Sequence, residues 1–102
     1  MSYRVRACVK EIRGHYAISY KPGDCFLIER YYIRDARRGV CLHALAAILT
    51  LVSPFLKGVS ARALDMGRED DVGYVQCPDP EEPHTSGGTV VFELRREEIK
   101  EY

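Results

Sequence analysis

Alternating apolar and polar residues predict β-strands near both ends of the chain. In Tyr3–Lys10 the odd-numbered residues are apolar and share one face, while the even-numbered residues share a polar face. Tyr16–Tyr20 alternates in the same way, and three further strands are expected at Cys25–Glu29 with an extension toward Ile33, Val72–Cys77 and Thr89–Arg95. Lys21-Pro22-Gly23-Asp24 has the sequence of a type II turn, so the first strands are expected to pair antiparallel.

A long uncharged segment, Val40–Leu56, separates the two groups of strands and predicts a central helix. Its most apolar face is formed by Cys41, Leu45, Ile48, Leu49, Val52, Phe55 and Leu56. The opposite face is smaller and more polar, and its His43 and Thr50 are candidates to face a partner. Pro54 is expected to end or kink the helix near Ser53, with Lys57-Gly58 as the final stop.

These elements predict one α+β domain over residues 1–102, because a chain of this length supports a single core. We expect a small antiparallel sheet of four or five strands with one long helix packed on it, in the order β-β-β-α-β-β. A charged tail is expected from about Arg96. The apolar run approaches the length of a membrane span, but it contains His43, Ser53 and Pro54, so we expect a core helix and no membrane segment.

The charges balance overall but not along the chain. Residues 1–40 hold nine Lys/Arg and four Asp/Glu, for a net charge of +5, and residues 41–102 hold six and eleven, for −5. The halves can neutralise each other within one domain, or complementary faces can join two copies of the chain. The chain also lacks Asn, has one Gln and has more Arg than Lys, which predicts a thermophilic source.

Four cysteines are scattered along the chain, and their spacing matches neither a zinc ribbon nor a thioredoxin motif. The N-terminal residues lack the apolar stretch of a signal peptide, so we expect a cytoplasmic protein with reduced thiols. Intracellular proteins of hyperthermophiles are the exception to that expectation, because they often contain structural disulfides. Four cysteines allow three full pairings, and the sequence does not choose among them.

Cys41 and Cys77 are the strongest candidates for a chemical site. Cys41 lies near the predicted start of the helix, where backbone N–H groups favour a thiolate, and Cys77 ends a strand before a Pro-rich turn. If the helix packs on the sheet, the two thiols could form a disulfide, a reactive pair or two ligands of zinc or another soft metal. The alternative is two small buried apolar residues. His43 follows Cys41 by two residues, so within a helix the two side chains diverge.

Nucleic acid is an alternative partner, because basic and aromatic residues are interleaved in the first third of the chain. Such a face stacks bases and follows phosphates. The candidate residues are Arg30, Tyr31, Tyr32, Arg34, Arg37 and Arg38. The balanced total charge, in contrast, is not that of a general nucleic-acid-coating protein.

Four motifs, taken in order, resemble a family of small prokaryotic proteins of uncharacterised activity. They are Gly23-Asp24-x-Phe26-x-Ile28, Gly39-x-Cys41-x-His43-Ala44-Leu45, Cys77-Pro78-Asp79-Pro80 and Val91-Phe92-Glu93-Leu94-Arg95. The resemblance covers about residues 3 to 96. Val59–Asp65 stands where family members carry a Trp-containing segment, and His84–Gly88 is an insertion. The resemblance implies no activity.

The chain contains neither a phosphate-binding Gly-rich loop nor a nucleophile-elbow motif. The leading hypothesis is therefore a non-enzymatic binding or assembly module, expected to form a homodimer through a helix face or a sheet edge, without a cofactor. A thiol or metal site at Cys41 and Cys77, serving redox or small-ligand chemistry, is the first alternative, and nucleic-acid binding is the second.

Overall fold

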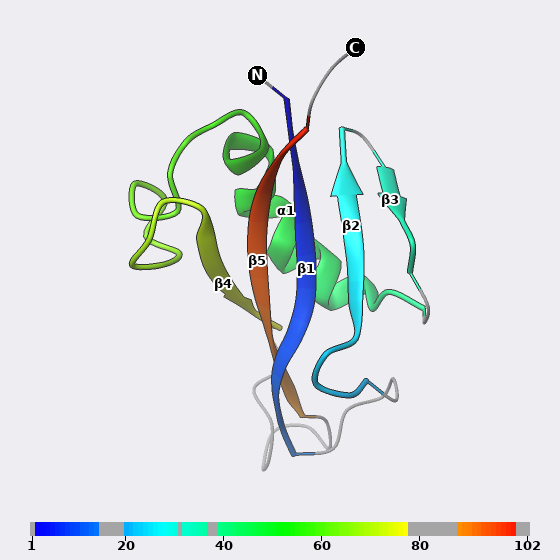
Figure 1. Cartoon of the computed structure of the whole chain (residues 1–102). Coiled ribbons are helices and arrows are strands. Elements are labelled where there is room, and N and C mark those ends of the chain that lie inside the picture. Colours follow the sequence, from blue (N-terminus) through cyan, green and yellow to red (C-terminus); the bar gives the residue numbers. More distant parts are fainter. Residues whose placement is uncertain (1, 15–19, 31, 37–38, 78–87, 100–102) are drawn as a thin grey trace.

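A five-stranded antiparallel sheet carries one helix on one of its faces (Figure 1). The computed structural model describes residues 2–14, 20–30, 32–36, 39–77 and 88–99. The elements are β1 (Ser2–Arg13), β2 (Cys25–Glu29), β3 (Tyr32–Arg34), α1 (Leu42–Leu56), β4 (Val72–Gln76) and β5 (Thr89–Ile99). The strands lie in the order β3-β2-β1-β5-β4, and every neighbouring pair is antiparallel. The predicted α+β class and its element order are confirmed.

Two of the predicted strands differ in their boundaries. The expected strand Tyr16–Tyr20 falls mostly outside the described residues, and Tyr20 lies ahead of β2. The expected extension from β2 to Ile33 is wrong, because Arg30 adopts a left-handed conformation with φ of 54° and the chain reverses. Ile33 therefore belongs to β3 and pairs with Ile28.

The expected charged tail from about Arg96 is also wrong for the residues that the structure describes. β5 continues to Ile99 and pairs with β1 as far as Ser2. The alternation of Val90, Phe92 and Leu94 toward the core continues at Arg96, whose side chain is only 5% exposed. The charge of Arg96 suggests an exposed tail. The two-residue period of the strand instead places its side chain on the inner face of the sheet.

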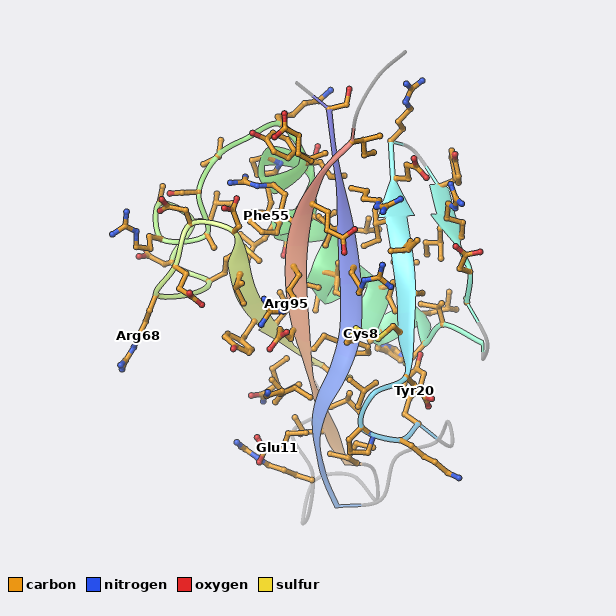
Figure 2. All side chains as sticks on the ribbon, viewed as in Figure 1. Cys8, Glu11, Tyr20, Phe55, Arg68 and Arg95 are labelled. Atoms are coloured by element: carbon orange, nitrogen blue, oxygen red, sulfur yellow. A yellow bond between two sulfur atoms is a disulfide. The ribbon has the colours of Figure 1, made fainter. Side chains whose placement is uncertain are left out.

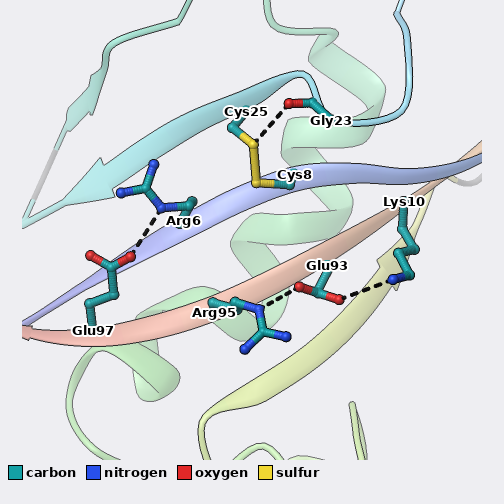
Figure 3. The surroundings of a disulfide bond; sticks show 8 residues. All are labelled: Arg6, Cys8, Lys10, Gly23, Cys25, Glu93, Arg95 and Glu97. Atoms are coloured by element: carbon teal, nitrogen blue, oxygen red, sulfur yellow. Dashed lines mark hydrogen bonds and ion pairs between the residues drawn. A yellow bond between two sulfur atoms is a disulfide. The ribbon is translucent and has the colours of Figure 1, made fainter.

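The two faces of the sheet have opposite character. Val5, Ala7 and Val9 of β1 are buried against the helix, as predicted. On the other face, Glu97 accepts hydrogen bonds from Arg4 Nε at 2.8 Å and Arg6 Nε at 3.0 Å. Glu93 accepts one from Arg95 Nε at 2.6 Å and lies 3.7 Å from Lys10 Nζ (Figure 3). Partial burial opposes ionisation of both carboxyl groups, but these cations hold the pKa of each below its usual value.

The helix crosses the inner face of the sheet because β3 and β4, which flank it in sequence, lie at opposite edges. Its buried residues are Ala44, Ile48, Val52 and Phe55. Three of them were predicted to face the core, whereas Leu49 of the predicted apolar face is 54% exposed. The helix is thus rotated slightly from the predicted orientation.

Pro54 lies inside α1, which continues to Leu56, so the expected end near Ser53 is wrong. Proline removes one backbone donor, and in the last turn of a helix this costs a single hydrogen bond. The turn closes at Gly58, whose φ of 103° is the left-handed conformation that glycine tolerates, and the predicted stop at Lys57-Gly58 is confirmed.

Arg96 holds the C-terminal end of α1 on the sheet. Its Nη1 donates to the carbonyl oxygens of Phe55 at 2.9 Å and Val59 at 2.8 Å. Its Nε and Nη2 donate to Asp71 Oδ1 at 2.9 and 2.7 Å, and Nη2 also reaches the Asp70 carbonyl at 3.3 Å. The guanidinium lies 4.7 Å from the ring centres of both Tyr3 and Phe55. All five of its N–H donors therefore have an acceptor within a nearly closed site.

Replacing Arg96 by Lys is expected to lower the free energy of unfolding by about 3 kcal/mol, because an ammonium group cannot reach these acceptors together and leaves some of the carbonyl groups unpaired. Urea unfolding at neutral pH measures the change. Arg95→Lys is the matched control on the exposed face, where the loss is expected to stay below about 1 kcal/mol. Equal losses in the two variants would contradict the anchoring role of Arg96.

Candidate functional site

The helix covers only part of the sheet. It packs most closely on β1, β4 and β5 and less closely on the inner face of β2 and β3. A groove of about 370 Å³ lies there, lined by Ile28, Arg30, Tyr32, Ile33, Leu45, Leu49, Val52, Ser53 and Leu56. Six of these nine residues are aliphatic, and Arg30 is the charged one. The groove is therefore an apolar recess with one cation at its rim.

The solvent-facing side of α1 continues this apolar surface. Leu42 is 79% exposed and Leu49 is 54% exposed, and the exposed residues Ala46 and Ser53 lie between and beyond them at helical spacing. The helix contains no Lys, Arg, Asp or Glu. We call the exposed residues Leu42, Ala46, Leu49 and Ser53, together with the groove, the helix-side surface.

His43 and Thr50, the two residues predicted to face a partner, are both exposed on α1. The Thr50 hydroxyl donates a hydrogen bond to the Ala47 carbonyl within the helix at 2.7 Å. Their exposure is compatible with the prediction, but the pattern of the sequence does not reveal the larger apolar areas at Leu42 and Leu49. It assigns Leu49 to the core, because apolar character alone does not separate an interface from a core.

The Tyr20 hydroxyl joins Gly39 to Cys41. Its Oη donates to the Gly39 carbonyl at 3.0 Å and accepts the Cys41 backbone N–H at 3.0 Å. Burial raises the pKa of Tyr20, the hydrogen bond from Cys41 opposes the rise, and the nearby thiols of Cys41 and Cys77 add to it. Tyr20, which lies just ahead of β2 (Figure 2), and Cys77 belong to one hydrophobic core, and Cys41 packs against it.

The two cysteines differ in access to solvent. Cys41 is the N-cap residue of α1 and is partly exposed, with no side-chain cap hydrogen bond. Cys77 is 3% exposed, and its backbone N–H donates to the Val90 carbonyl. Sequence reasoning found both residues but not Tyr20, because a tyrosine in an alternating segment looks like any other strand residue.

The other two cysteines form a disulfide. Cys8 and Cys25 lie directly opposite each other on β1 and β2, on the face away from the helix, with their Cα atoms 4.1 Å apart (Figure 3). The bond closes a separation of 17 residues, a loop size for which chain entropy gives about 3 kcal/mol of stabilisation. This pairing, which the sequence left open, does not include Cys41 or Cys77.

The candidate nucleic-acid residues are divided by the structure. Arg30 and Tyr32 line the apolar groove, whereas Arg34 donates to Glu29 at 2.6 Å and lies 3.5 Å from Asp35. Tyr31, Arg37 and Arg38 lie outside the described residues. The described residues of this set therefore do not form one continuous basic face.

Neither a metal cluster nor a membrane-spanning helix occurs in the part of the chain that the structure describes. That part holds no group of three or more His, Cys, Asp or Glu side chains arranged to bind a metal ion. Within the same residues, no helix has the length and apolar character needed to cross a membrane.

Comparisons with protein-family models, with curated proteins and with solved structures found no match to this chain. The resemblance described above therefore depends on the four ordered motifs alone.

Tyr20→Phe is expected to lower the free energy of unfolding at neutral pH by about 1–2 kcal/mol, because Gly39 and Cys41 lose their buried partner. As pH rises into the alkaline range, Tyr20→Phe should also lose less stability than the wild-type protein does. The pKa of Tyr20 is raised above its usual 10.0, so above that pH the unfolded chain releases this proton before the folded chain does, and stability falls.

Urea unfolding of both proteins from pH 8 upward measures this dependence. The two curves should converge as pH rises toward and beyond the usual tyrosine pKa of 10.0. Tyr74→Phe, which removes an exposed hydroxyl on β4, is the control for a lost phenol and should cost less at neutral pH. A difference between wild type and Tyr20→Phe that stays constant with pH would contradict the assigned pKa shift.

Proposed function

We propose that the protein is a non-enzymatic binding and assembly module whose working surface is the helix-side surface. The observation that carries this proposal is the exposure of Leu42 and Leu49 on a helix without a charged residue, directly beside an apolar groove.

Surface helices of soluble domains normally present charged residues to water on the side opposite the core. On α1 that side is formed by leucine, alanine, threonine and serine, with His43 near its start. Contiguous apolar patches of this kind mark interaction surfaces, because covering them with a partner removes apolar area from water.

The residues lining the groove favour binding over catalysis. Among the described lining residues, Arg30 and Tyr32 are the titratable ones, and no carboxylate or imidazole stands beside them in that lining. General acid–base and nucleophilic mechanisms need such groups within hydrogen-bond reach of a substrate. An apolar segment of a protein chain, with an acidic group placed near Arg30, fits this composition.

An anilinonaphthalene sulfonate dye tests the surface directly, because its fluorescence rises on apolar protein surfaces. At low protein concentration the wild-type chain is expected to enhance the dye, and Leu49→Glu to reduce the enhancement by about threefold or more, since it places a charge at the mouth of the groove. Gln76→Glu, which adds the same charge on exposed β4, should behave as wild type. Circular dichroism must show both variants folded, and equal enhancement in all three proteins would remove the proposal.

Thiol chemistry at Cys41 is a second candidate function, supported by the arrangement around Tyr20. Cys41 stands at the start of a 15-residue helix, where the backbone N–H groups and the helix dipole favour a thiolate, and it is partly exposed. Cys77 is buried in the hydrophobic core against which Cys41 packs.

Alkylation by iodoacetamide under native, non-reducing conditions tests this candidate. Cys41 is expected to react about tenfold faster than a free model thiol at neutral pH, while Cys77 reacts only after unfolding and the disulfide cysteines do not react. Mass spectrometry after proteolysis locates the label, and Cys41→Ser is the control. Metal analysis of the untagged protein accompanies it. Ordinary reactivity at Cys41 together with no bound metal would leave both thiols as structural residues.

A further inference from the structure

We propose that the partner on the helix-side surface is a second copy of this chain, related to the first by a two-fold axis that runs along the strand direction. This inference rests on the proposed function, because it names the occupant of the same surface. Three features support it: the sheet order, the size of the surface and the charges at its two sides.

The exposed stripe of α1 is too small to hold a partner by itself. A helix of 15 residues is about 22 Å long and about 10 Å wide, so its outer side offers only about 220 Å² in projection. A stable interface removes about 800 Å² from each partner. The partner must therefore also cover the groove and the segments on either side of it, which together make up the whole inner face of the molecule.

A cation lies on one side of that face and an acidic segment on the other. On the β3 side, Arg30 lines the groove. On the β4 side, residues 59–71 connect α1 to β4 and contain four acidic and two basic residues, for a net charge of −2. Asp70 and Asp71 of this segment lie beside Arg96, which points to the helix side of the sheet, and their side chains are more than half exposed.

A two-fold axis along the strands exchanges the edges of the sheet. Because β3 and β4 are the outermost strands, the β3 side of one copy then faces the β4 side of its partner. Arg30 of each copy meets the acidic segment of the other, while the uncharged helices meet at the centre. One surface is thus complementary to itself, which is what a closed dimer requires. A foreign partner would need both charges and the apolar centre in the same arrangement.

Analytical ultracentrifugation of the full chain over a range of concentrations tests the dimer. The wild-type chain and Gln76→Glu are expected to sediment as dimers at about 100 μM, and Leu49→Glu as a monomer, with a dissociation constant raised by about 100-fold, because the central leucine pair becomes a pair of charges. Circular dichroism again verifies folding of each variant.

A charge exchange tests the orientation. Arg30→Glu alone and Asp70→Arg alone should each weaken the homodimer, since both contacts in the symmetric pair become repulsive. An equimolar mixture of the two variants should form a heterodimer. In it, the introduced carboxylate of one copy faces the introduced guanidinium of the other, and the native Asp70 faces the native Arg30. Asp70 also pairs with exposed Arg62, and losing that surface pair leaves the fold intact.

The possible results are distinguishable. A wild-type monomer at about 100 μM, a concentration at which specific interfaces of standard size are occupied, would overturn the second copy as the partner, and the dye result would then decide separately whether the surface binds another chain. A wild-type dimer that Leu49→Glu leaves unchanged would place the interface elsewhere, and a mixture of charge variants that stays monomeric would overturn the proposed axis. Dimers in the wild type and in the mixture, with monomers in the single variants, would support the proposal.

Discussion

The buried guanidinium of Arg96 joins strand β5 to the end of the helix and to the segment that follows it. It donates to carbonyl oxygens on both sides of the helix end and to Asp71, and two aromatic rings enclose it. A cation in such a place is stable only when all its donors are satisfied, so the surrounding chain has little freedom to move. The position of α1 on the sheet follows from this anchor and from the buried row along the helix.

With the helix in that position, part of the apolar inner face of the sheet remains uncovered. The helix packs most closely on β1, β4 and β5, and an apolar groove lies between it and the inner face of β2 and β3. In a single small domain, one helix cannot cover five strands. The remaining apolar surface is therefore a consequence of the fold, and a partner that covers it would complete the second layer.

The opposite face of the sheet is stabilised in a different way. Carboxylates on β5 stand between cations on β1 and β5, and the disulfide joins β1 to β2 on the same face. The opposite charges there form ion pairs across neighbouring strands, so this face is stable in contact with water. The apolar surface that a partner could cover therefore lies on the helix side.

The alternation of residues along β1 and β5, and the uncharged run of α1, were sufficient to predict the class of fold and the order of its elements, because side-chain period depends only on local backbone geometry. The sequence also identified Cys41 and Cys77 as candidates for a thiol or metal site. It did not identify the partner of each cysteine, since pairing depends on strand register, and it did not place Arg96 inside. Which leucines of α1 face water was decided by the rotation of the helix on the sheet, a property of tertiary packing that no single segment contains.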